Sequence, residues 1–252
     1  MKIAVLNQKG GIGKTSISTN LSYLLSESNK KTLLIDLDPQ AHSTIIFCPE
    51  IPKATVKDLL LNDNADISQL IKPAVVKDKA SENLFILPAS IHLAAAIEQL
   101  VNRFHREKIL FNHLKKVDFD FIIIDCPPML GSLTANAIYA SDIILIPTTF
   151  SKYALDGIAD LFASITAVKE TESFHFRIIK NMFDPRVKRT NKFIDDQLRP
   201  FEKFLTKTII RKSESINQAQ MTNAPVAIFD PSGNGTKDFQ ELVKEVLEWA
   251  KK

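Results

Sequence analysis

A short segment near the N-terminus, residues 8–15 (QKGGIGKT), has the residue types and spacing of a phosphate-binding site. Its last residues match the end of the phosphate-binding loop pattern G-x-x-x-x-G-K-[ST]. Lys14 could reach the β- and γ-phosphates of a nucleotide, the Thr15 hydroxyl could hold Mg²⁺, and Ser16 could contact the α-phosphate. The remaining loop residues would offer backbone N–H groups to phosphate oxygens: Gly10, Gly11, Ile12 and Gly13. The alternative is a glycine-rich turn with an incidental lysine.

Two residues of this segment depart from the standard loop. Gln8 occupies the position of the first glycine, and Lys9 adds a second positive charge. The surroundings still match a phosphate loop, because an apolar run at residues 3–6 precedes it and apolar residues at helical spacing follow it. A helix that begins near Lys14 would add its positive end to the attraction for phosphate.

Three aspartates at predicted strand ends are candidates for binding a metal ion or orienting water. Asp125 ends the apolar run FIIID, while Asp36 and Asp38 lie at the end of the run in LLIDLDPQ. The carboxyl ends of parallel strands border the crevice where ligands bind, so we expect these carboxylates to face the loop. One carboxylate could hold Mg²⁺ through water, and another could orient an attacking water molecule. Taken singly, each could instead belong to a polar turn.

The apolar residues predict an α/β fold with a doubly wound, mostly parallel sheet and helices on both faces. Four Ile-rich runs are continuous rather than alternating, which is typical of strands covered on both faces: residues 3–6, 33–35, 121–124 and 143–146. Helical spacing recurs between them, as at residues 155–168. We expect one domain over residues 1–252, with residues 49–83 forming an inserted short helix and loops, and a final helix from about Gly235 to Lys252.

The composition argues against several classes of protein. The 252 residues are 45% apolar, which allows a sizeable core, and the net charge of +3 permits an anionic partner without requiring one. Cys48 and Cys126 form no CxxC pair, so a clustered metal site is not expected. No stretch has the roughly 18–20 apolar residues of a membrane helix, and the N-terminus does not match a signal peptide. We therefore expect a cytoplasmic protein with no membrane partner.

Taken together, these segments resemble the ParA/MinD ATPases. Residues 9–15 match the deviant Walker A motif of that family, K-G-G-x-G-K-[TS]. The segments DLDPQ and DCPP, with residues 154–157 (ALDG) and 225–226 (PV), most resemble the ParA partition proteins within it. The resemblance covers nearly the whole chain and is weakest at residues 49–83. It is to the short form of these proteins, which has no N-terminal DNA-binding domain.

The resemblance implies ATP and Mg²⁺ as cofactors and a role for each site residue. Lys9 would cross the interface of an ATP-bound homodimer to the nucleotide of the partner, as an arginine finger does, unless it is a solvated surface lysine. Asp38 would position the hydrolytic water, and Asp36 and Asp125 would support the metal. Asn181, at the end of the segment FHFRIIKN, would read the adenine, unless it is a turn asparagine. We expect weak intrinsic hydrolysis, because no arginine finger can be identified.

The resemblance also implies three partners: a second copy of the chain, nonspecific double-stranded DNA, and a ParB-like centromere-binding protein that stimulates hydrolysis. Residues 180–212 contain ten Lys/Arg and four Asp/Glu, and this net charge of +6 suits phosphate backbones. The candidate DNA-binding residues are Lys188, Arg189, Arg211 and Lys212. A solvated helix face would also explain these charges. We expect a nucleoid-associated protein of DNA segregation.

Three other functions fit parts of the sequence. A MinD-like membrane-cycling ATPase that regulates positioning or division would need a basic amphipathic C-terminal helix, but KDFQELVKEVLEWAKK mixes acidic and basic residues. An iron–sulfur protein of the same fold would need paired cysteines, which Cys48 and Cys126 do not provide. A carboxylate-activating ligase is suggested by fold analogy alone.

Overall fold

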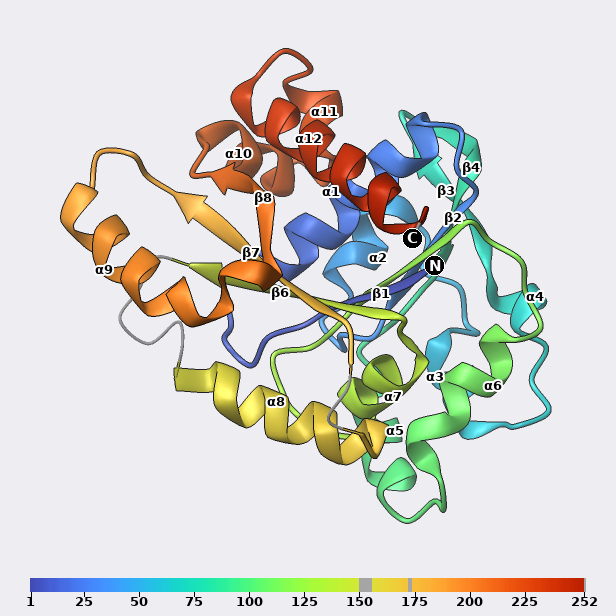
Figure 1. Cartoon of the computed structure of the whole chain (residues 1–252). Helices are drawn as coiled ribbons and strands as arrows, with labels where there is room; N and C mark the ends of the chain where they lie inside the picture. The colour runs from blue at the N-terminus through green and yellow to red at the C-terminus, as the bar shows by residue number, and fades with distance from the viewer. Residues whose placement is uncertain (150–155, 172–173, 252) are drawn as a thin grey trace.

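An eight-stranded sheet forms the centre of the computed structural model, which describes residues 1–149, 156–171 and 174–251 (Figure 1). The strands lie in the order β3-β4-β2-β5-β1-β6-β7-β8, and every neighbouring pair except β3–β4 is parallel. Their bounds are β1 Lys2–Val5, β2 Thr32–Asp36, β3 Lys72–Val76, β4 Lys79–Leu87, β5 Phe121–Asp125, β6 Ile143–Thr149, β7 Phe176–Phe183 and β8 Leu205–Arg211. The predicted doubly wound, mostly parallel α/β fold is confirmed.

Helices cover both faces of this sheet (Figure 1). One face carries α1 Lys14–Glu27, α2 His42–Phe47, α10 Glu214–Met221, α11 Val226–Phe229 and α12 Asn234–Trp249. The other carries α3 Val56–Leu61, α4 Ile67–Leu70, α5 Leu93–Val101, α6 Ile109–Leu114, α7 Ser132–Ala140, α8 Asp156–Lys169 and α9 Lys188–Leu198. Two short 3-10 helices, η1 Arg106–Lys108 and η2 Arg199–Phe204, complete the described elements.

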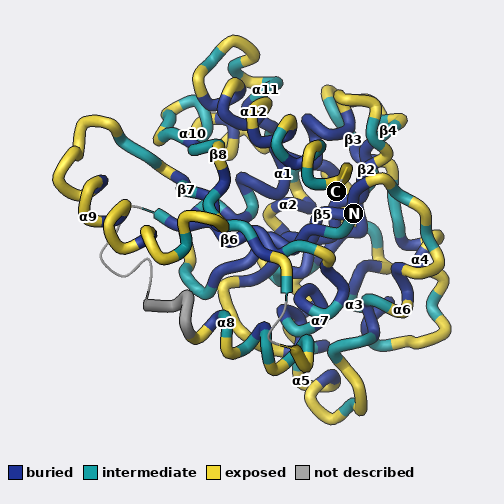
Figure 2. Tube along the Cα trace, viewed as in Figure 1, coloured by how far each residue is buried: buried dark blue, intermediate teal, exposed yellow. Residues whose placement is uncertain are grey.

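The strands contribute side chains to an apolar core on each face. In β1, Ile3 and Val5 pack with α1 and α12, whereas Ala4 packs on the opposite side of the sheet. All three are fully buried. Because both faces of the strand are covered, neither needs polar residues, and the apolar run is continuous. Figure 2 shows this buried centre beneath more exposed helices.

Residues 49–83 form more regular structure than we predicted from the sequence. Besides α3 and α4, they contain β3 and the beginning of β4, an antiparallel hairpin at one edge of the sheet. The second strand, β4, continues inward and pairs in parallel with β2. The prediction of one short helix and loops was therefore wrong, and this segment extends the main sheet.

The predicted C-terminal helix is present as α12, and it packs on the sheet. Its apolar residues Phe239, Leu242 and Val246 are buried against the face that carries α1. Among the described residues, no helix combines the length and the apolar character that crossing a membrane requires. The predicted helix at residues 155–168 is seen as α8, although Ala154 and Leu155 of the family-like segment lie outside the described residues.

Candidate nucleotide-binding site

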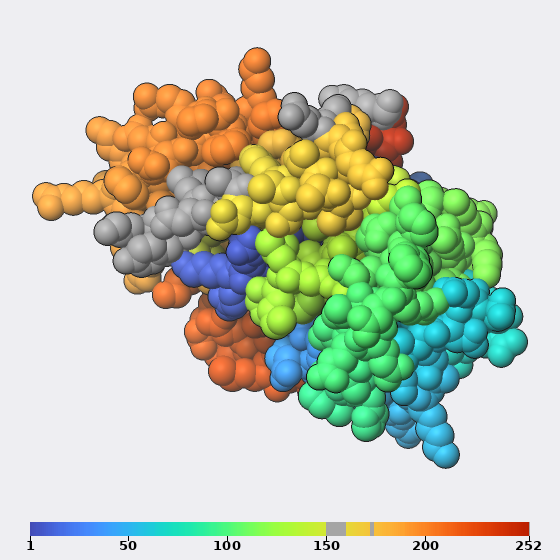
Figure 3. All heavy atoms as spheres, turned by 90° about the horizontal axis from the view of Figure 1, so that it is seen from below, coloured from blue at the N-terminus to red at the C-terminus, as the bar shows by residue number. Residues whose placement is uncertain are grey.

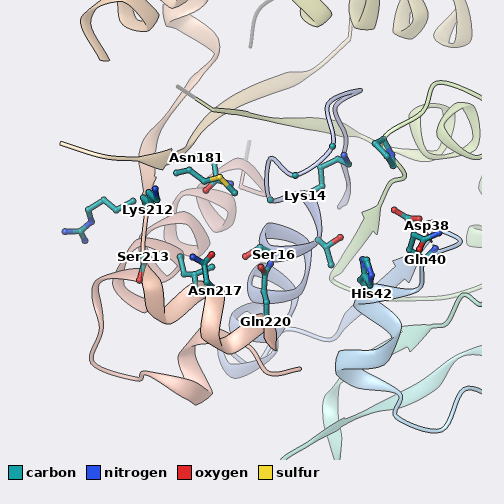
Figure 4. A pocket seen from close by; sticks show the side chains of 18 residues that line it. Lys14, Ser16, Asp38, Gln40, His42, Asn181, Lys212, Ser213, Asn217 and Gln220 are labelled. Carbon is teal, nitrogen blue, oxygen red and sulfur yellow. Dashed lines mark hydrogen bonds between the residues drawn. The ribbon is translucent and has the colours of Figure 1, made fainter. Parts of the chain in front are cut away.

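A pocket of about 540 Å³ lies at the carboxyl ends of the central strands, beside the start of α1 (Figure 4). Residues of the predicted phosphate loop line it together with Asp38 and Asn181. Figure 4 shows Asp38, Gln40 and His42 on one side, and Ser213, Asn217 and Gln220 of the α10 region on the other. The fold thus brings together residues as far apart in the chain as Gly10 and Gln220.

The phosphate loop ends in a backbone arrangement that suits an anion. Gly11 and Gly13 have φ angles of 71° and 86°, in the left-handed region that glycine adopts without a steric penalty. Helix α1 begins directly after Gly13, and no described side chain caps its first N–H groups. The Ser16 hydroxyl is buried and has no hydrogen-bond partner among the described residues. Unpaired donors at a helix N-terminus form a ready site for phosphate.

The loop lysines are linked through the backbone. The Lys14 ammonium donates to the Lys9 carbonyl at 3.0 Å, and the Lys9 N–H donates to Asn7 Oδ1 at 3.1 Å. Asn7 is buried, and its own amide donates to the Pro147 carbonyl at the end of β6 at 2.8 Å. Burial lowers the pKa of Lys14, and the Asp125 carboxylate opposes that effect. Lys14, the first residue of α1, thus directs its ammonium group back to the loop.

Asp125 fits a metal-supporting role. It is buried, and Ser18 donates to its Oδ1 at 3.0 Å, but its Oδ2 accepts no hydrogen bond within the described part of the chain. Burial, and next the neighbouring Asp36 carboxylate, raise the pKa of Asp125 to about 7, against hydrogen bonds from Thr15 and Ser18. An unpaired buried carboxylate oxygen next to a threonine hydroxyl is the donor set that Mg²⁺ prefers.

The surroundings of Asp36 differ from those of Asp125. It lies beside Asp125 in the register of β2 and β5. Its Oδ2 accepts from the backbone N–H of Thr44 at 2.9 Å and from the Thr44 hydroxyl at 2.7 Å, and its Oδ1 accepts from the Asp38 N–H at 3.0 Å. Burial raises the pKa of Asp36, and these hydrogen bonds oppose the rise. Asp36 therefore fixes the start of α2 and the Asp38 segment to the end of the sheet.

Asp38 lies in the wall of the pocket. Its Oδ1 accepts from the Gln40 N–H at 2.9 Å, which leaves the other carboxylate oxygen available to orient a water molecule. The side chain is half-buried. The geometry separates the two aspartates, because Asp36 is a buried anchor of this segment and Asp38 lines the pocket.

Comparisons with known proteins agree with this geometry. Residues 1–178 match the family described as an AAA domain. The chain is 36% identical to the sporulation initiation inhibitor protein Soj of Bacillus subtilis, with 97% of each chain covered. It is 32% identical to the chromosome partitioning protein ParA of Myxococcus xanthus, with 98% of this chain and 87% of the relative covered. The chain belongs to the ParA family of ATPases.

Two solved structures show the same fold with a bound nucleotide. A putative plasmid partition protein from Borrelia burgdorferi bound to AMPPNP superposes with a TM-score of 0.83 at 26% identity, covering 98% of both chains. Cobyrinic acid a,c-diamide synthase from Mycobacterium smegmatis with bound ADP and magnesium gives 0.81 at 27% identity, covering 99% of this chain and 95% of the other. Both the partition proteins and this synthase therefore share the architecture of this ParA-family chain.

The candidate DNA-binding residues of this ParA-family chain fall into two groups. Lys188 and Arg189 are exposed on α9, whereas Arg211 and Lys212 line the nucleotide pocket. The Arg211 guanidinium forms a salt bridge of 2.5 Å with Asp238 of α12. The pair is reinforced because the Arg211 backbone N–H also donates to this carboxylate, at 2.9 Å. The basic segment is therefore not one continuous surface.

Sequence reasoning missed several pocket residues. His42 begins α2 and lines the pocket, and none of the motifs found in the sequence includes it. Its position, four residues after Asp38, could have indicated this placement. Met182, Ile216 and Asn217 also line the pocket, and no motif in the sequence identifies them.

The two cysteines of this ParA-family chain form no disulfide. Cys48 and Cys126 are both buried and unpaired. In the ranges that the structure describes, no cluster of three or more His, Cys, Asp or Glu side chains could hold a metal ion. The geometry gives no support to the iron–sulfur alternative.

Proposed function

We propose that residues 1–252 act as a single P-loop domain that binds and hydrolyses ATP with Mg²⁺ in order to segregate DNA. The observation that supports this proposal best is the meeting of an uncapped α1 N-terminus with an unpaired buried oxygen of Asp125. The first suits phosphate and the second suits a divalent cation, which together are the two parts of MgATP. The identities of 36% and 32% to Soj of Bacillus subtilis and ParA of Myxococcus xanthus exceed the 27% to the diamide synthase, which favours segregation over ligase chemistry.

Each loop residue has a distinct task in this proposal. The loop backbone and Lys14 bind the phosphates, and the Ser16 hydroxyl contacts the α-phosphate. The Thr15 hydroxyl and Asp125 hold Mg²⁺, which neutralises charge on the terminal phosphates. Asp36 supports the ion indirectly, through a bound water or through neighbouring residues. Asp38 orients the attacking water from the pocket wall.

The deviant lysine makes dimerisation depend on ATP in this proposal. ATP carries about four negative charges, which Lys14 and Mg²⁺ do not fully balance. Lys9 of one subunit supplies a further cation to the nucleotide of its partner, so the sandwich dimer is stable only when ATP is bound. Intrinsic hydrolysis is slow, and it returns the protein to the monomer.

The ATP-bound dimer binds DNA without sequence preference. The exposed cations of α9 suit contact with phosphate backbones, which carry no sequence information. Association with DNA places the protein on the nucleoid. A ParB-like protein stimulates hydrolysis and thereby releases the dimer from DNA.

Sizing chromatography with ADP and with ATP tests this proposal directly. Asp38→Ala is used to block hydrolysis, and we expect it to form a stable dimer with ATP and a monomer with ADP. Adding Lys9→Ala should abolish the dimer while the affinity of the monomer for MgATP changes by less than about threefold, because the lysine acts on the partner's nucleotide.

Lys116→Ala is the matched control, since Lys116 is exposed at the end of α6 and its loss removes the same charge. We expect this variant to dimerise normally with ATP. A normal ATP-dependent dimer in the Lys9→Ala protein would show that this lysine does not act across the interface.

A further inference from the structure

A buried threonine near the start of α2 joins two segments of the chain to Asp36. Thr44 is fully buried. Its hydroxyl donates to Asp36 Oδ2 at 2.7 Å and accepts from the backbone N–H of Ala89 at 2.9 Å. The backbone N–H of Thr44 donates to the same Asp36 oxygen at 2.9 Å. Thr44 therefore holds the carboxylate at the end of β2 with two donors, and it also binds the segment that follows β4.

The direction of the two hydroxyl bonds is fixed by their partners. A backbone N–H can only donate, so the bond from Ala89 uses the Thr44 oxygen as its acceptor. The single hydroxyl proton is then available for Asp36, which accepts it. Valine has nearly the same shape as threonine but would serve neither partner. It would take a donor from the carboxylate and leave a buried N–H unpaired, which is unfavourable.

The Asp36 carboxylate passes this constraint on to Asp38. Its other oxygen, Oδ1, accepts from the Asp38 backbone N–H at 3.0 Å. One planar group thus accepts three donors, and rotating it would disturb all of them. The backbone position of Asp38 therefore depends on the orientation of Asp36, which the Thr44 hydroxyl helps to fix. From this backbone position the Asp38 side chain reaches the wall of the pocket.

The residue before Asp38 is held in a different way. The Leu37 N–H donates to the Asp125 carbonyl at 2.9 Å, which continues the pairing of β2 with β5. This bond lies between two backbones and does not involve Thr44. Asp38 lies one residue further along, and a side chain binds its N–H instead. The two neighbouring amides can therefore distinguish a loss of Asp36 orientation from a general loosening of the sheet.

We propose that Thr44 is a positioning residue for hydrolysis, which orients Asp36 and thereby holds Asp38 at the pocket wall. Thr44 is not among the residues that line the pocket, so it acts through Asp36. The inference rests on the proposed hydrolysis of ATP in this pocket. It predicts slower hydrolysis with unchanged binding of MgATP, because the phosphate loop and Lys14 bind the phosphates.

The kinetic test compares wild type, Thr44→Val and Thr44→Ser in single-turnover hydrolysis of bound MgATP. The rate is expressed per nucleotide-binding site, so a loss of folded protein does not lower it. We expect valine to slow hydrolysis about tenfold, as when a residue that orients a metal-supporting carboxylate is removed. The Kd for MgATP should change by less than about threefold. Serine keeps the hydroxyl, and its rate should stay within about threefold of wild type.

Amide hydrogen exchange, followed by nuclear magnetic resonance, gives a readout that does not depend on activity. In ligand-free Thr44→Val we expect the Asp38 amide to exchange about tenfold faster than in wild type, because its acceptor is no longer held in place. The Leu37 amide is bound by the sheet and should exchange at the wild-type rate. Thr44→Ser should protect both amides. Equal acceleration of both amides in Thr44→Val would show a general loosening and would overturn the inference.

Thr32→Val is the matched control. Thr32 begins β2, is as fully buried as Thr44, and donates its hydroxyl to the Lys30 carbonyl at 2.9 Å. The substitution removes a similar hydroxyl at the opposite end of the strand that carries Asp36, and we expect the wild-type rate. A wild-type rate in Thr44→Val, or an equal loss in Thr32→Val, would overturn the inference. Failure of wild type itself to bind or hydrolyse MgATP would instead refute the proposed function.

A measurement on wild type covers the case in which Thr44→Val does not fold. Ala89 lies outside the pocket and is bonded to Asp36 through the Thr44 hydroxyl. Adding Mg²⁺ to the ADP-bound protein should shift the Ala89 amide resonance, because a cation near Asp36 polarises the hydroxyl that lies between them. The Thr32 amide, at the other end of β2, is the reference. An Ala89 resonance that stays in place while that of Asp38 shifts would overturn the inference.

Discussion

The two buried aspartates at the ends of β2 and β5 are the most electrostatically unusual residues of the site. Asp36 and Asp125 are paired in register, so two carboxylates lie side by side where little water reaches them. Burial and mutual repulsion raise the pKa of Asp125 to about 7. A bound cation would relieve both effects, which is why the pair indicates a metal site and also destabilises the ligand-free protein.

This raised pKa predicts how the stability of the ligand-free protein depends on pH. The folded-state pKa of Asp125, about 7, exceeds its ordinary value of 3.8, so between these two pH values the folded protein binds a proton that the unfolded chain does not. The free energy of unfolding therefore falls as pH rises through that window. Asp125→Asn removes this effect, and we expect it to stabilise the protein at pH 8 by on the order of 2 kcal/mol, with a smaller gain at pH 5.

Urea unfolding at both pH values, without nucleotide or divalent cation, measures this difference. Asp142→Asn is the control, because Asp142 is an exposed carboxylate outside the pocket. An Asp125→Asn gain that is as large at pH 5 as at pH 8 would contradict the assignment of the raised pKa to this residue.

At the scale of elements, two acidic residues join α12 to β8: Glu245 accepts from the backbone N–H groups of Lys207 and Thr208, and Asp238 pairs with Arg211. Asp238 of α12 is 7% exposed and accepts from the Nε and Nη2 of Arg211 as well as from its backbone N–H. A carboxylate buried to this degree needs its partner. The pair therefore joins the last helix to the edge strand that borders the nucleotide pocket.

We expect Arg211→Ala to destabilise the protein by about 2 kcal/mol, since it leaves Asp238 buried without its cation. Lys212→Ala, the matched control on the next residue, should change stability by less than about 0.5 kcal/mol, because Lys212 is exposed. Urea unfolding measures both. Weaker DNA binding by Arg211→Ala at unchanged unfolding midpoint would show that this arginine contacts DNA after all.

Sequence reasoning predicted the strands for which a single requirement, burial on both faces, determines the choice of residues. The runs at β1, β2, β5 and β6 are buried on both faces, so their composition alone identifies them. The hairpin of β3 and β4 lies at the sheet edge, and its burial alternates irregularly. It contains Pro73, and its turn places Lys77 and Asp78 at positive φ instead of the glycine that usually marks such turns.

In the candidate site, too, short local motifs could be predicted from the sequence, whereas contacts between residues far apart in the chain could not. The phosphate loop and its aspartates are local motifs; the loop and Asp38 line one pocket, and Asp36 and Asp125 are buried at the neighbouring strand ends. The walls from α10 and from Met182 could not be predicted, because they reach the pocket only through the order of strands in the sheet. The hydrogen bond from the Asn181 amide to the Ile12 carbonyl joins residues 169 positions apart, and no spacing rule identifies such a contact.

Across the whole molecule, the cations of residues 180–212 are distributed unevenly. Four of them form salt bridges with nearby carboxylates: Lys180 with Asp195, Arg186 with Asp184, Arg199 with Asp196, and Arg211 with Asp238. In the part of the chain that the structure describes, Lys188, Arg189 and Lys192 of α9 form no salt bridge and are exposed. Figure 3 shows this segment (orange) protruding at one edge of the molecule.

These exposed α9 cations lead to a prediction about DNA binding by the ATP-bound protein. The opposite side of α9 buries Ile194 and Leu198, so the helix is fixed with its cations toward solvent. In an Asp38→Ala background with ATP, replacing both Lys188 and Arg189 by alanine should weaken DNA binding and reduce the slope of log K against log salt by about 2, as for two lost phosphate contacts.

The control for this experiment replaces Lys115 and Lys116 by alanine, which removes the same charge from an adjacent exposed pair at the end of α6. If α9 is the DNA contact, this pair leaves the salt slope unchanged, because distant charges affect binding only through the screened net charge. An equal reduction of the slope in both double variants would assign DNA attraction to the overall charge of the molecule, and the α9 surface would then have no special role.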